Sequence, residues 1–470
     1  MAILLALFLK AFLVEAYKIP SGSMQPTLMG MPSPGEVVIA RGSERPPEVN
    51  DRILVDKLTP KLRDPKRWEV LVFRYPLKRT QNFVKRLVGM PGEQLRIAYG
   101  DILTRTEDDQ SWSVERRPRR VQEAHWRPVT SASPKNPWRQ TAGAGWSLDE
   151  DSIIASGSGT ASWGDGGSIL ALYFDGYPES LRESLPARHP RNEELFPIGD
   201  LRLSGELRPD ASCQSIVFTL SEGDRRYRFL IPGPSGDAAS RATIEVTPAT
   251  HADAELGRLV AEAGGPLRAG KVVEFEVENL DDRLTLRLDG EEVAALEIDS
   301  AADQQSRVTI DVVEGQVEFT ELELERDIYY FAKRRTEYDI PEDHYLMLGD
   351  NTFNSSDGRE WMAARFEPLD RPGEVVVGNR RAGGDNPSHT TRLPEVGAYF
   401  RFTDQWGVDH FYQDDLSRAP ATPPDWLTRV RELPDEAAPF VERDLIVGRA
   451  LAVFWPLAPH KGILRFKWVD

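Results

Sequence analysis

The chain has little cysteine and no clustered positive charge, and both features exclude classes of protein. Its 470 residues include one cysteine, Cys213. A single thiol cannot form a disulfide within the chain, and without Cys-x-x-Cys or Cys/His pairs we expect no zinc site. Acidic residues number 75 against 58 basic ones, a net charge of -17. Nucleic acid is not an expected partner, because binding its phosphates needs a clustered positive surface.

Several catalytic motifs are also missing. The sequence has no His-Glu-x-x-His, P-loop, Gly-x-Gly-x-x-Gly or Gly-x-Ser-x-Gly. Their absence disfavours a metalloprotease, a nucleotide-binding protein and a hydrolase with a nucleophile elbow. A Ser-His-Asp mechanism is disfavoured too, since His125, His189 and His251 lie in or beside expected insertions and His344 is typical of a turn. We expect neither a metal nor a cofactor.

Long apolar runs are scarce, and the longest one opens the chain as "MAILLALFLKAFLV", residues 1–14. A helix of this length rises about 21 Å, short of the ~30 Å hydrocarbon core of a bilayer. The basic start and the Ala-x-Ala ending of a cleavable signal peptide are missing. We therefore expect residues 1–17 to form a membrane anchor, either short and interfacial or the end of a span that begins before Met1.

The rest of the chain has the pattern of a mainly β protein. Short β-branched runs between turn residues predict strands at 35–40, 51–58, 68–75 and 82–89. Eight or more further runs between 146 and 330, with an Asp-Gly hairpin signal at 289–290, predict a sandwich of jelly-roll type, similar in pattern to concanavalin-like or laminin-G-like domains. Core-like strands then resume, and one short helix is expected near 424–433.

These patterns divide the chain into a core and its insertions. The expected segments are a membrane anchor (1–17), the first part of a β core (18–103), an irregular linker (104–145), an inserted β-sandwich (146–330), the second part of the core (331–378), a second insertion (379–440), and a terminal core strand with a tail (441–470).

Four stretches of the core carry candidate chemistry. They are "IPSGSMQPTL" (19–28), "DRILVDKL" (51–58), the pair "WEVLVFRYP" and "NFVKRLVGMPGE" (68–76 and 82–93), and "MLGDNTFNSSDGREW" (347–361), with "LIVGRALAVFW" (445–455) as a terminal strand. Each alone is modest evidence. Their order and joint occurrence resemble bacterial type I signal peptidase over roughly a third of the chain, and the resemblance implies a signal-peptidase-type β core.

The resemblance implies a catalytic pair. Ser23 matches the nucleophile and Lys85 the general base. A lysine has an ordinary pKa of ~10.4 and must be desolvated before it can accept a proton at neutral pH. Strict alternation along the strand places Lys85 on the face of Phe83 and Leu87, whose burial would depress its pKa. Ser21 and the backbone N–H of Ser23 match the oxyanion donors, with Gly22 expected to allow the tight turn between them.

Other matched positions support this pair or the substrate. Ser355 matches a hydroxyl that orients the lysine, Asp357 and Arg359 a bracing pair, and Asp350 with Asn351 structural positions near Lys85. Ile19, Pro20 and Val84 match the walls of shallow pockets that admit only small side chains. The chain departs from the family pattern at Thr352–Phe353, where the family often has Arg-Asp, and at Gly358, where it often has Ser.

The resemblance implies a membrane-bound serine endopeptidase on the outer face of the cytoplasmic membrane. Its partners would be membrane lipid and the signal peptides of exported preproteins, cut after small residues at positions -1 and -3. The second "GDN", residues 384–386, lacks the following Ser-x-Asp and is expected to be a loop. One alternative stays open: the core is a degenerate scaffold, and the inserted sandwich binds carbohydrate or protein. The ligand of the sandwich cannot be deduced from the sequence.

Overall fold

A computed structural model shows a mainly β protein, as the sequence predicts. It describes residues 13–30, 50–106, 111–129, 136–149, 152–177, 196–247, 258–260, 264–299, 305–379, 390–393, 397–413, 424–458 and 463–469. The expected strand at 35–40, the second "GDN" and residues 1–12 of the expected anchor lie outside these ranges.

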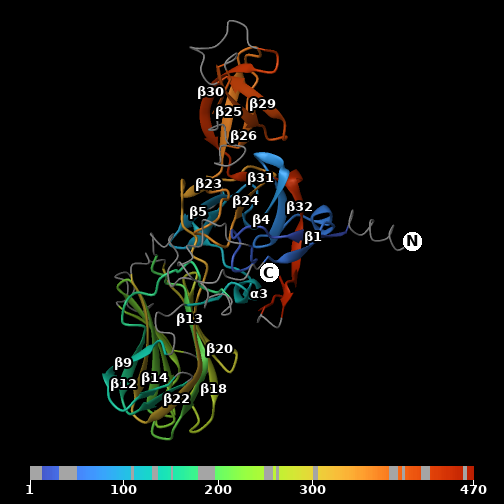
Figure 1. Cartoon of the computed structure of the whole chain (residues 1–470). Helices are drawn as coiled ribbons and strands as arrows, with labels where there is room; N and C mark the ends of the chain where they lie inside the picture. The colour runs from blue at the N-terminus through green and yellow to red at the C-terminus, as the bar shows by residue number, and fades with distance from the viewer. Residues whose placement is uncertain are drawn as a thin grey trace, which may run out of the picture.

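The central sheet of the molecule has eight strands and brings together segments from both ends of the chain (Figure 1). In spatial order these are β1 (Val14–Lys18), β2 (Arg52–Asp56), β32 (Ile446–Trp455), β3 (Val70–Tyr75), β4 (Lys78–Gly89), β24 (His344–Leu348) and β31 (Phe440–Glu442), with β35 (Lys467–Trp468) paired to β32. All of these pairs are antiparallel. The terminal strand therefore lies at the centre of the sheet, between β2 and β3.

A second, four-stranded sheet belongs to the same part of the molecule. Its order is β23 (Glu337–Asp339), β5 (Gln94–Ala98), β6 (Asp101–Arg105) and β7 (Ser113–Val114). Short helical segments connect the strands: α2 (Thr59–Leu62), α3 (Arg119–Glu123) and the 3₁₀ turn η2 (Arg443–Leu445). The apolar core below this sheet includes Trp68, Leu95 and Tyr330, all buried.

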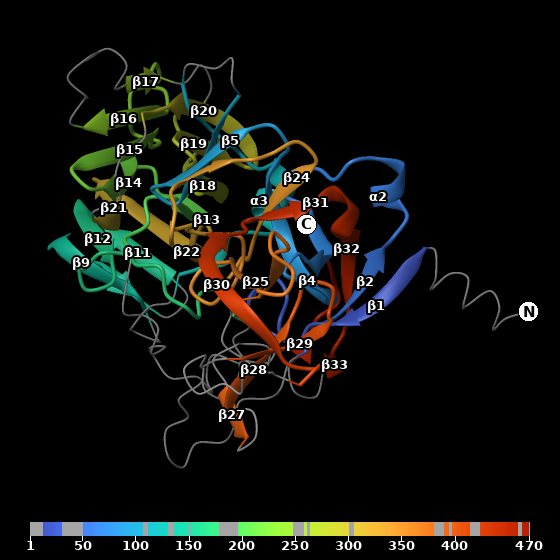
Figure 2. The same ribbon diagram turned by 90° about the horizontal axis from the view of Figure 1, so that it is seen from above.

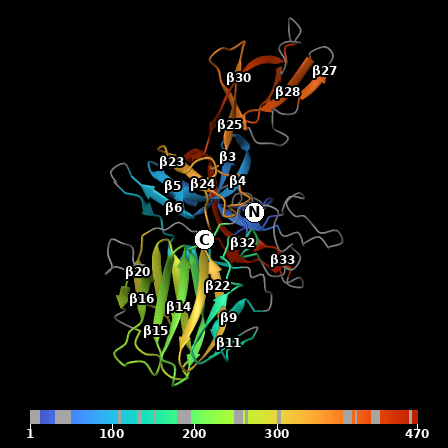
Figure 3. The ribbon, with the colours of Figure 1, turned by 90° about the vertical axis from the view of Figure 1, so that its left-hand side faces the viewer.

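The inserted domain consists of two sheets facing each other, seen edge-on as two layers in Figure 1 and face-on in Figure 3. One runs β10 (Ser147–Leu148), β11 (Ser152–Ser156), β22 (Gln316–Arg326), β13 (Leu201–Pro209), β18 (Val273–Leu280), β19 (Arg283–Leu288) and β20 (Glu291–Glu297), with β8 (Arg127–Pro128) paired to β22. The other runs β17 (Arg258–Val260), β16 (Thr243–Thr247), β15 (Arg225–Pro232), β14 (Ser215–Glu222), β21 (Ser306–Val313), β12 (Gly159–Trp163) and β9 (Trp138–Gly143). Alternating apolar residues of both sheets meet between the layers, where Phe218 stacks on Phe275 at 4.3 Å.

The boundaries of the sandwich differ from those expected. Its first strands, β8 from Arg127 and β9 from Trp138, lie inside the stretch expected to be irregular linker, which also holds α3. The Trp138 side chain belongs to the sandwich because it packs in the sandwich core, where it is 4% exposed. The incoming and outgoing chains lie side by side, since Arg127 and Pro128 of β8 pair with Arg326 and Glu325 of β22. Adjacent ends let a domain be inserted without disturbing its host.

A third group of strands forms a six-stranded sheet beyond the core. Its order is β26 (Val376–Asn379), β25 (Met362–Pro368), β30 (Thr428–Ala437), β29 (Asp409–Gln413), β28 (Gly397–Thr403) and β27 (Thr390–Leu393). Only β29 and β30 run parallel among these pairs. A two-stranded ribbon of β33 (Leu457–Ala458) and β34 (Ile463–Leu464) follows the terminal strand.

Two expectations are wrong in this region. The helix expected near 424–433 is instead strand β30 from Thr428, because its backbone pairs with β25 along one edge and with β29 along the other. Strands β25 and β26, expected in the second part of the core, pair within this sheet and not with the central one.

The described part of the N-terminal segment is extended. Val14 to Tyr17, assigned to the anchor from the sequence, belong to β1, whose backbone pairs with β2 from Val14↔Asp56 to Lys18↔Arg52. β1 lies at the edge of the central sheet, on the side away from the sandwich (Figure 2). No helix within the described ranges is both long and apolar enough to cross a membrane.

Candidate active site

Ser23 and Lys85 meet where the turn after β1 reaches strand β4. Ser23 lies in the turn that follows β1, and Lys85 is on β4. Lys85 Nζ and Ser23 Oγ are 2.5 Å apart, within hydrogen-bond distance. Both side chains are buried, with 3% of Lys85 and 9% of Ser23 exposed, and the Lys85 amine lies 5.6 Å from the centre of the Phe83 ring. The residues predicted as nucleophile and base are thus brought into contact.

The turn that carries Ser23 is held by backbone and amide contacts. Asn351 N donates to Ser23 O at 3.2 Å, and Asn351 Nδ2 donates to Gly22 O at 3.0 Å. Gly22 does not have a positive φ, so the backbone freedom of glycine is not what this turn requires. Space is the reason instead, because a Cβ on Gly22 would lie 2.6 Å from Gln25 Oε1.

Next to Lys85, a buried ion pair ties β4 to the loop after β24. Arg86 Nε and Nη2 donate to Asp350 Oδ1 and Oδ2 at 2.9 and 2.7 Å, and neither side chain is exposed. Thr27 Oγ1 donates to the same carboxylate at 2.6 Å. Burial opposes ionisation of Asp350, but the Arg86 charge and these hydrogen bonds outweigh it and hold its pKa well below the usual range. Three segments are therefore locked together beside the Ser23–Lys85 pair.

The second bracing pair predicted from the sequence is also buried. Arg359 Nε and Nη2 donate to Asp357 Oδ1 and Oδ2 at 2.8 and 2.7 Å. Asp357 Oδ2 also accepts from Gly349 N at 3.0 Å. Burial opposes its ionisation, and Arg359 outweighs that effect, so the pKa of Asp357 is well below its usual range. This pair fixes the backbone of Gly349, where an added Cβ would lie 2.4 Å from Ser23 O.

Ser355 is close to the site but does not make the contact expected of it. Its side chain is 2% exposed, and Oγ has no hydrogen-bond partner among the described residues. The expected hydrogen bond from Ser355 to Lys85 is therefore absent from the described structure. Its backbone is held differently, since Lys333 Nζ donates to Ser355 O at 2.8 Å.

A cavity of about 230 Å³ opens over the Ser23–Lys85 pair. Ile19, Pro20 and Val84, the predicted substrate-pocket residues, all line it, as does Ser21, which is exposed. The remaining wall residues are Tyr17, Lys18, Gly22, Ser23, Ile53, Val72, Gln81, Asn82, Phe83, Lys85, Asn354 and Ser356. No group of three metal-ligating side chains occurs among the described residues of this cavity.

The sandwich insertion contributes residues that the sequence analysis missed. Tyr177 OH donates to Gln25 Oε1, and Asn354 Nδ2 donates to Tyr173 OH at 2.9 Å. The segment that holds these tyrosines forms a turn at 173–176, and its aromatic rings pack on Met29. The density of aromatic residues in "LYFDGY" was a signal of burial, but nothing in the sequence identified the partner.

The two departures from the family pattern have local causes. Phe353 packs against Tyr173 of the insertion and against Phe331, with ring centres 6.3 and 5.7 Å apart. An apolar ring fits this covered position. A Cβ on Gly358 would lie 2.5 Å from Pro439 O, so a serine there would need the neighbouring backbone to move.

A comparison with known families identifies the family to which this chain is related. The sequence pattern of the family described as signal peptidase, peptidase S26, matches residues 1–137 and 269–378, more than half of the chain. The chain belongs to this signal peptidase family. The resemblance found in the sequence is thereby confirmed, and most of the stretch that the family pattern skips lies in the sandwich.

Individual relatives in the family are similar over shorter stretches. A probable signal peptidase I-2 of Synechocystis is 33% identical over 106 residues, 22% of this chain and 40% of that protein. Signal peptidase I of Pseudomonas aeruginosa is 38% identical over 104 residues, 20% of this chain and 30% of that protein. The chain thus covers less than half the length of these relatives.

The solved structures that match the chain are β-sandwich proteins, and their similarity to it is low. A carbohydrate binding module, CBM66, of Bacillus subtilis has a TM-score of 0.24 at 12% identity and covers 42% of this chain and 99% of that one. The galectin LEC-6 of Caenorhabditis elegans has a TM-score of 0.20 at 13% identity and covers 27% of this chain and 81% of that one. Scores this low support no functional argument for the insertion.

Proposed function

We propose that the chain is a membrane-associated serine endopeptidase that removes signal peptides from exported preproteins. The observation that carries the proposal is the 2.5 Å contact between Ser23 Oγ and Lys85 Nζ in the wall of an open cavity. A serine is a weak nucleophile unless a neighbouring base takes its proton. The family relationship makes peptide-bond hydrolysis the reaction that fits this pair.

In the proposed reaction, neutral Lys85 accepts the Ser23 hydroxyl proton as Oγ attacks the scissile carbonyl carbon. The carbonyl oxygen becomes an oxyanion, for which the Ser23 N–H and the Ser21 hydroxyl are the proposed donors. The C–N bond then breaks, and the Lys85 ammonium returns the proton to the leaving amine. Lys85 next deprotonates a water, which attacks the acyl ester and releases Ser23.

The cavity walls support selection of small side chains. Ile19, Pro20 and Val84 present carbon atoms rather than donors or acceptors, so a pocket between them would discriminate by steric exclusion. We propose that these pockets take small residues at positions -1 and -3. The apolar run at residues 1–14 is the proposed attachment to the cytoplasmic membrane, with the site on its outer face.

The direct test is cleavage of a synthetic peptide bearing Ala-x-Ala by the full chain purified in detergent. We expect cleavage after the second alanine and a loss of at least about 1,000-fold in rate for Ser23→Ala, because the covalent step is removed. Ser212→Ala, a change at an exposed serine of the sandwich, is the matched control and should cleave normally. Equal cleavage by wild type and Ser23→Ala would refute the proposal, and an inactive wild type would favour a binding scaffold.

Ser355 offers a test that separates stability from activity. A buried hydroxyl without a partner costs about 1–3 kcal/mol, so Ser355→Ala should unfold at the same or a higher temperature than wild type. If the hydroxyl orients Lys85 during turnover, kcat should fall about 10- to 100-fold. Thermal unfolding and peptide cleavage measure the two effects, with Ser212→Ala, at an exposed serine of the sandwich, as the control. An unchanged kcat would remove Ser355 from the proposed mechanism.

A further inference from the structure

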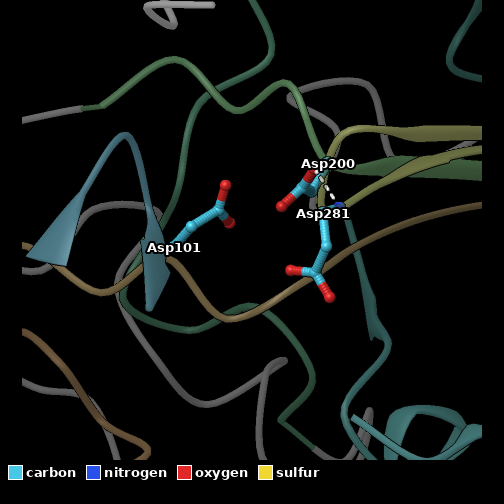
Figure 4. A group of neighbouring side chains, drawn as sticks. All are labelled: Asp101, Asp200 and Asp281. Atoms are coloured by element: carbon cyan, nitrogen blue, oxygen red, sulfur yellow. Dashed lines mark hydrogen bonds between the residues drawn. The ribbon is translucent and has the colours of Figure 1, made fainter. Parts of the chain in front are cut away.

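Three aspartates from separate parts of the fold converge at the junction of the catalytic core and the sandwich. Asp101 begins β6 of the four-stranded sheet, Asp200 immediately precedes β13, and Asp281 lies in the turn between β18 and β19. One carboxylate oxygen from each lies within 4.8 Å of the other two, and Figure 4 shows the three groups around a shared space. Residues 180 positions apart are thus assembled by folding and not by a local acidic run.

The environment of Asp281 is a second indication that a ligand binds between the three aspartates. Its side chain is 4% exposed, and its Oδ2 has no hydrogen-bond partner within the described part of the chain. Figure 4 shows one oxygen of its carboxylate turned toward the space that it shares with Asp101 and Asp200. A buried carboxylate oxygen without a donor is costly. Within the group, the backbone N–H of Asp281 donates a hydrogen bond to Asp200 Oδ1 at 3.2 Å. This bond gives Asp200 a donor but none to the Oδ2 atom of Asp281.

The nearby arginines have other partners. Arg117 Nη1 donates to Asp327 Oδ2 at 2.5 Å. Arg116 donates to the backbone oxygen of Asp281 and forms an ion pair with Glu297 at 2.6 Å. Within the described ranges, no ion pair joins either arginine to Asp200 or Asp281.

We propose that Asp101, Asp200 and Asp281 bind one calcium ion that joins the core to the sandwich. Calcium accepts carboxylate oxygens at 2.3–2.6 Å, so ligands on one ion can be up to about 5 Å apart, as here. Magnesium holds its ligands at about 2.0–2.1 Å and usually keeps several waters with one or two carboxylates, so three protein carboxylates suit calcium better. Backbone oxygens and water would complete the coordination shell. Because the ligands come from two domains, the ion opposes their separation.

The test uses the full chain in detergent, first treated with EGTA and then titrated with CaCl₂. At 5 mM calcium we expect the unfolding midpoint to rise by about 3 °C, and isothermal titration to give one site per chain with a Kd of about 0.1–1 mM. Asp281→Asn should lose most of this shift and should be no less stable than wild type without calcium. Asp224→Asn, the same change at an exposed turn of the sandwich, should retain it.

Three outcomes would overturn the proposal: no calcium shift in wild type, equal shifts in Asp281→Asn and Asp224→Asn, or a magnesium shift as large as the calcium shift. Asp101→Asn is the second variant if Asp281→Asn does not fold, and it too should lose the shift. The readout is binding and unfolding, so failure of the calcium site leaves the peptidase proposal unaffected.

Discussion

Replacing Lys85 with methionine is expected to abolish peptide cleavage while leaving the protein folded. Methionine has nearly the length of lysine and no basic nitrogen, and position 85 is already buried on β4 beside Phe83. The Ser23 hydroxyl would then have no base at 2.5 Å. Loss of a general base lowers the cleavage rate about 10²- to 10⁴-fold. Because Lys85 is also the proposed acid that protonates the leaving amine, we expect a loss at the upper end of this range. Single-turnover cleavage of the Ala-x-Ala peptide measures this.

The control for this variant is Lys78→Met, the same substitution at a half-buried lysine at the start of the same strand. It should cleave at the wild-type rate. In the wild type the rate should rise with pH as the Lys85 amine loses its proton, and Lys85→Met should show no such rise. A Lys85→Met enzyme that kept a tenth or more of wild-type activity with the same pH profile would exclude Lys85 as the base.

The contact between Ser23 and Lys85 could be predicted from the sequence because its signals are local. The segment around Ser23 is contiguous, and strict alternation along one strand placed Lys85 on the face of Leu87, which is fully buried. The match to a known family then linked segments that are more than 300 residues apart. That link also predicted the Arg359–Asp357 pair, whose two members are only two residues apart.

The contacts between the insertion and the core could not be predicted in this way. Tyr177 reaches Gln25, and Tyr173 accepts from Asn354, across separations of 152 and 181 residues that no local pattern encodes. The same limit explains the errors around β25 and β30. Periodicity indicates that a segment is a strand, but it does not say which sheet supplies its partners. Phe353 illustrates the point, since its departure from the family pattern becomes intelligible only with Tyr173 beside it.

Breaking the buried pair of Arg86 and Asp350 is expected to have the largest effect on stability. Asp350→Asn leaves the Arg86 guanidinium buried with 0% exposure and removes the charge that compensates it. Loss of one partner of such a pair costs about 3–5 kcal/mol of unfolding free energy, whereas an exposed pair contributes about 0–1 kcal/mol. Glu337→Gln, at the pair with Arg96 where the side chains are 53% and 36% exposed, is therefore the matched control.

The pH dependence of unfolding supplies an independent check on the same pair. The pKa of Asp350 is lower in the folded protein than in the unfolded chain, where it is about 3.9. Its contribution to stability is therefore fully present above that unfolded value and is lost as the pH falls toward the folded value. Calorimetric scans of wild type and Asp350→Asn should be far apart at pH 7 and converge in acid. Parallel curves at every pH would mean that Asp350 does not stabilise the fold through its charge.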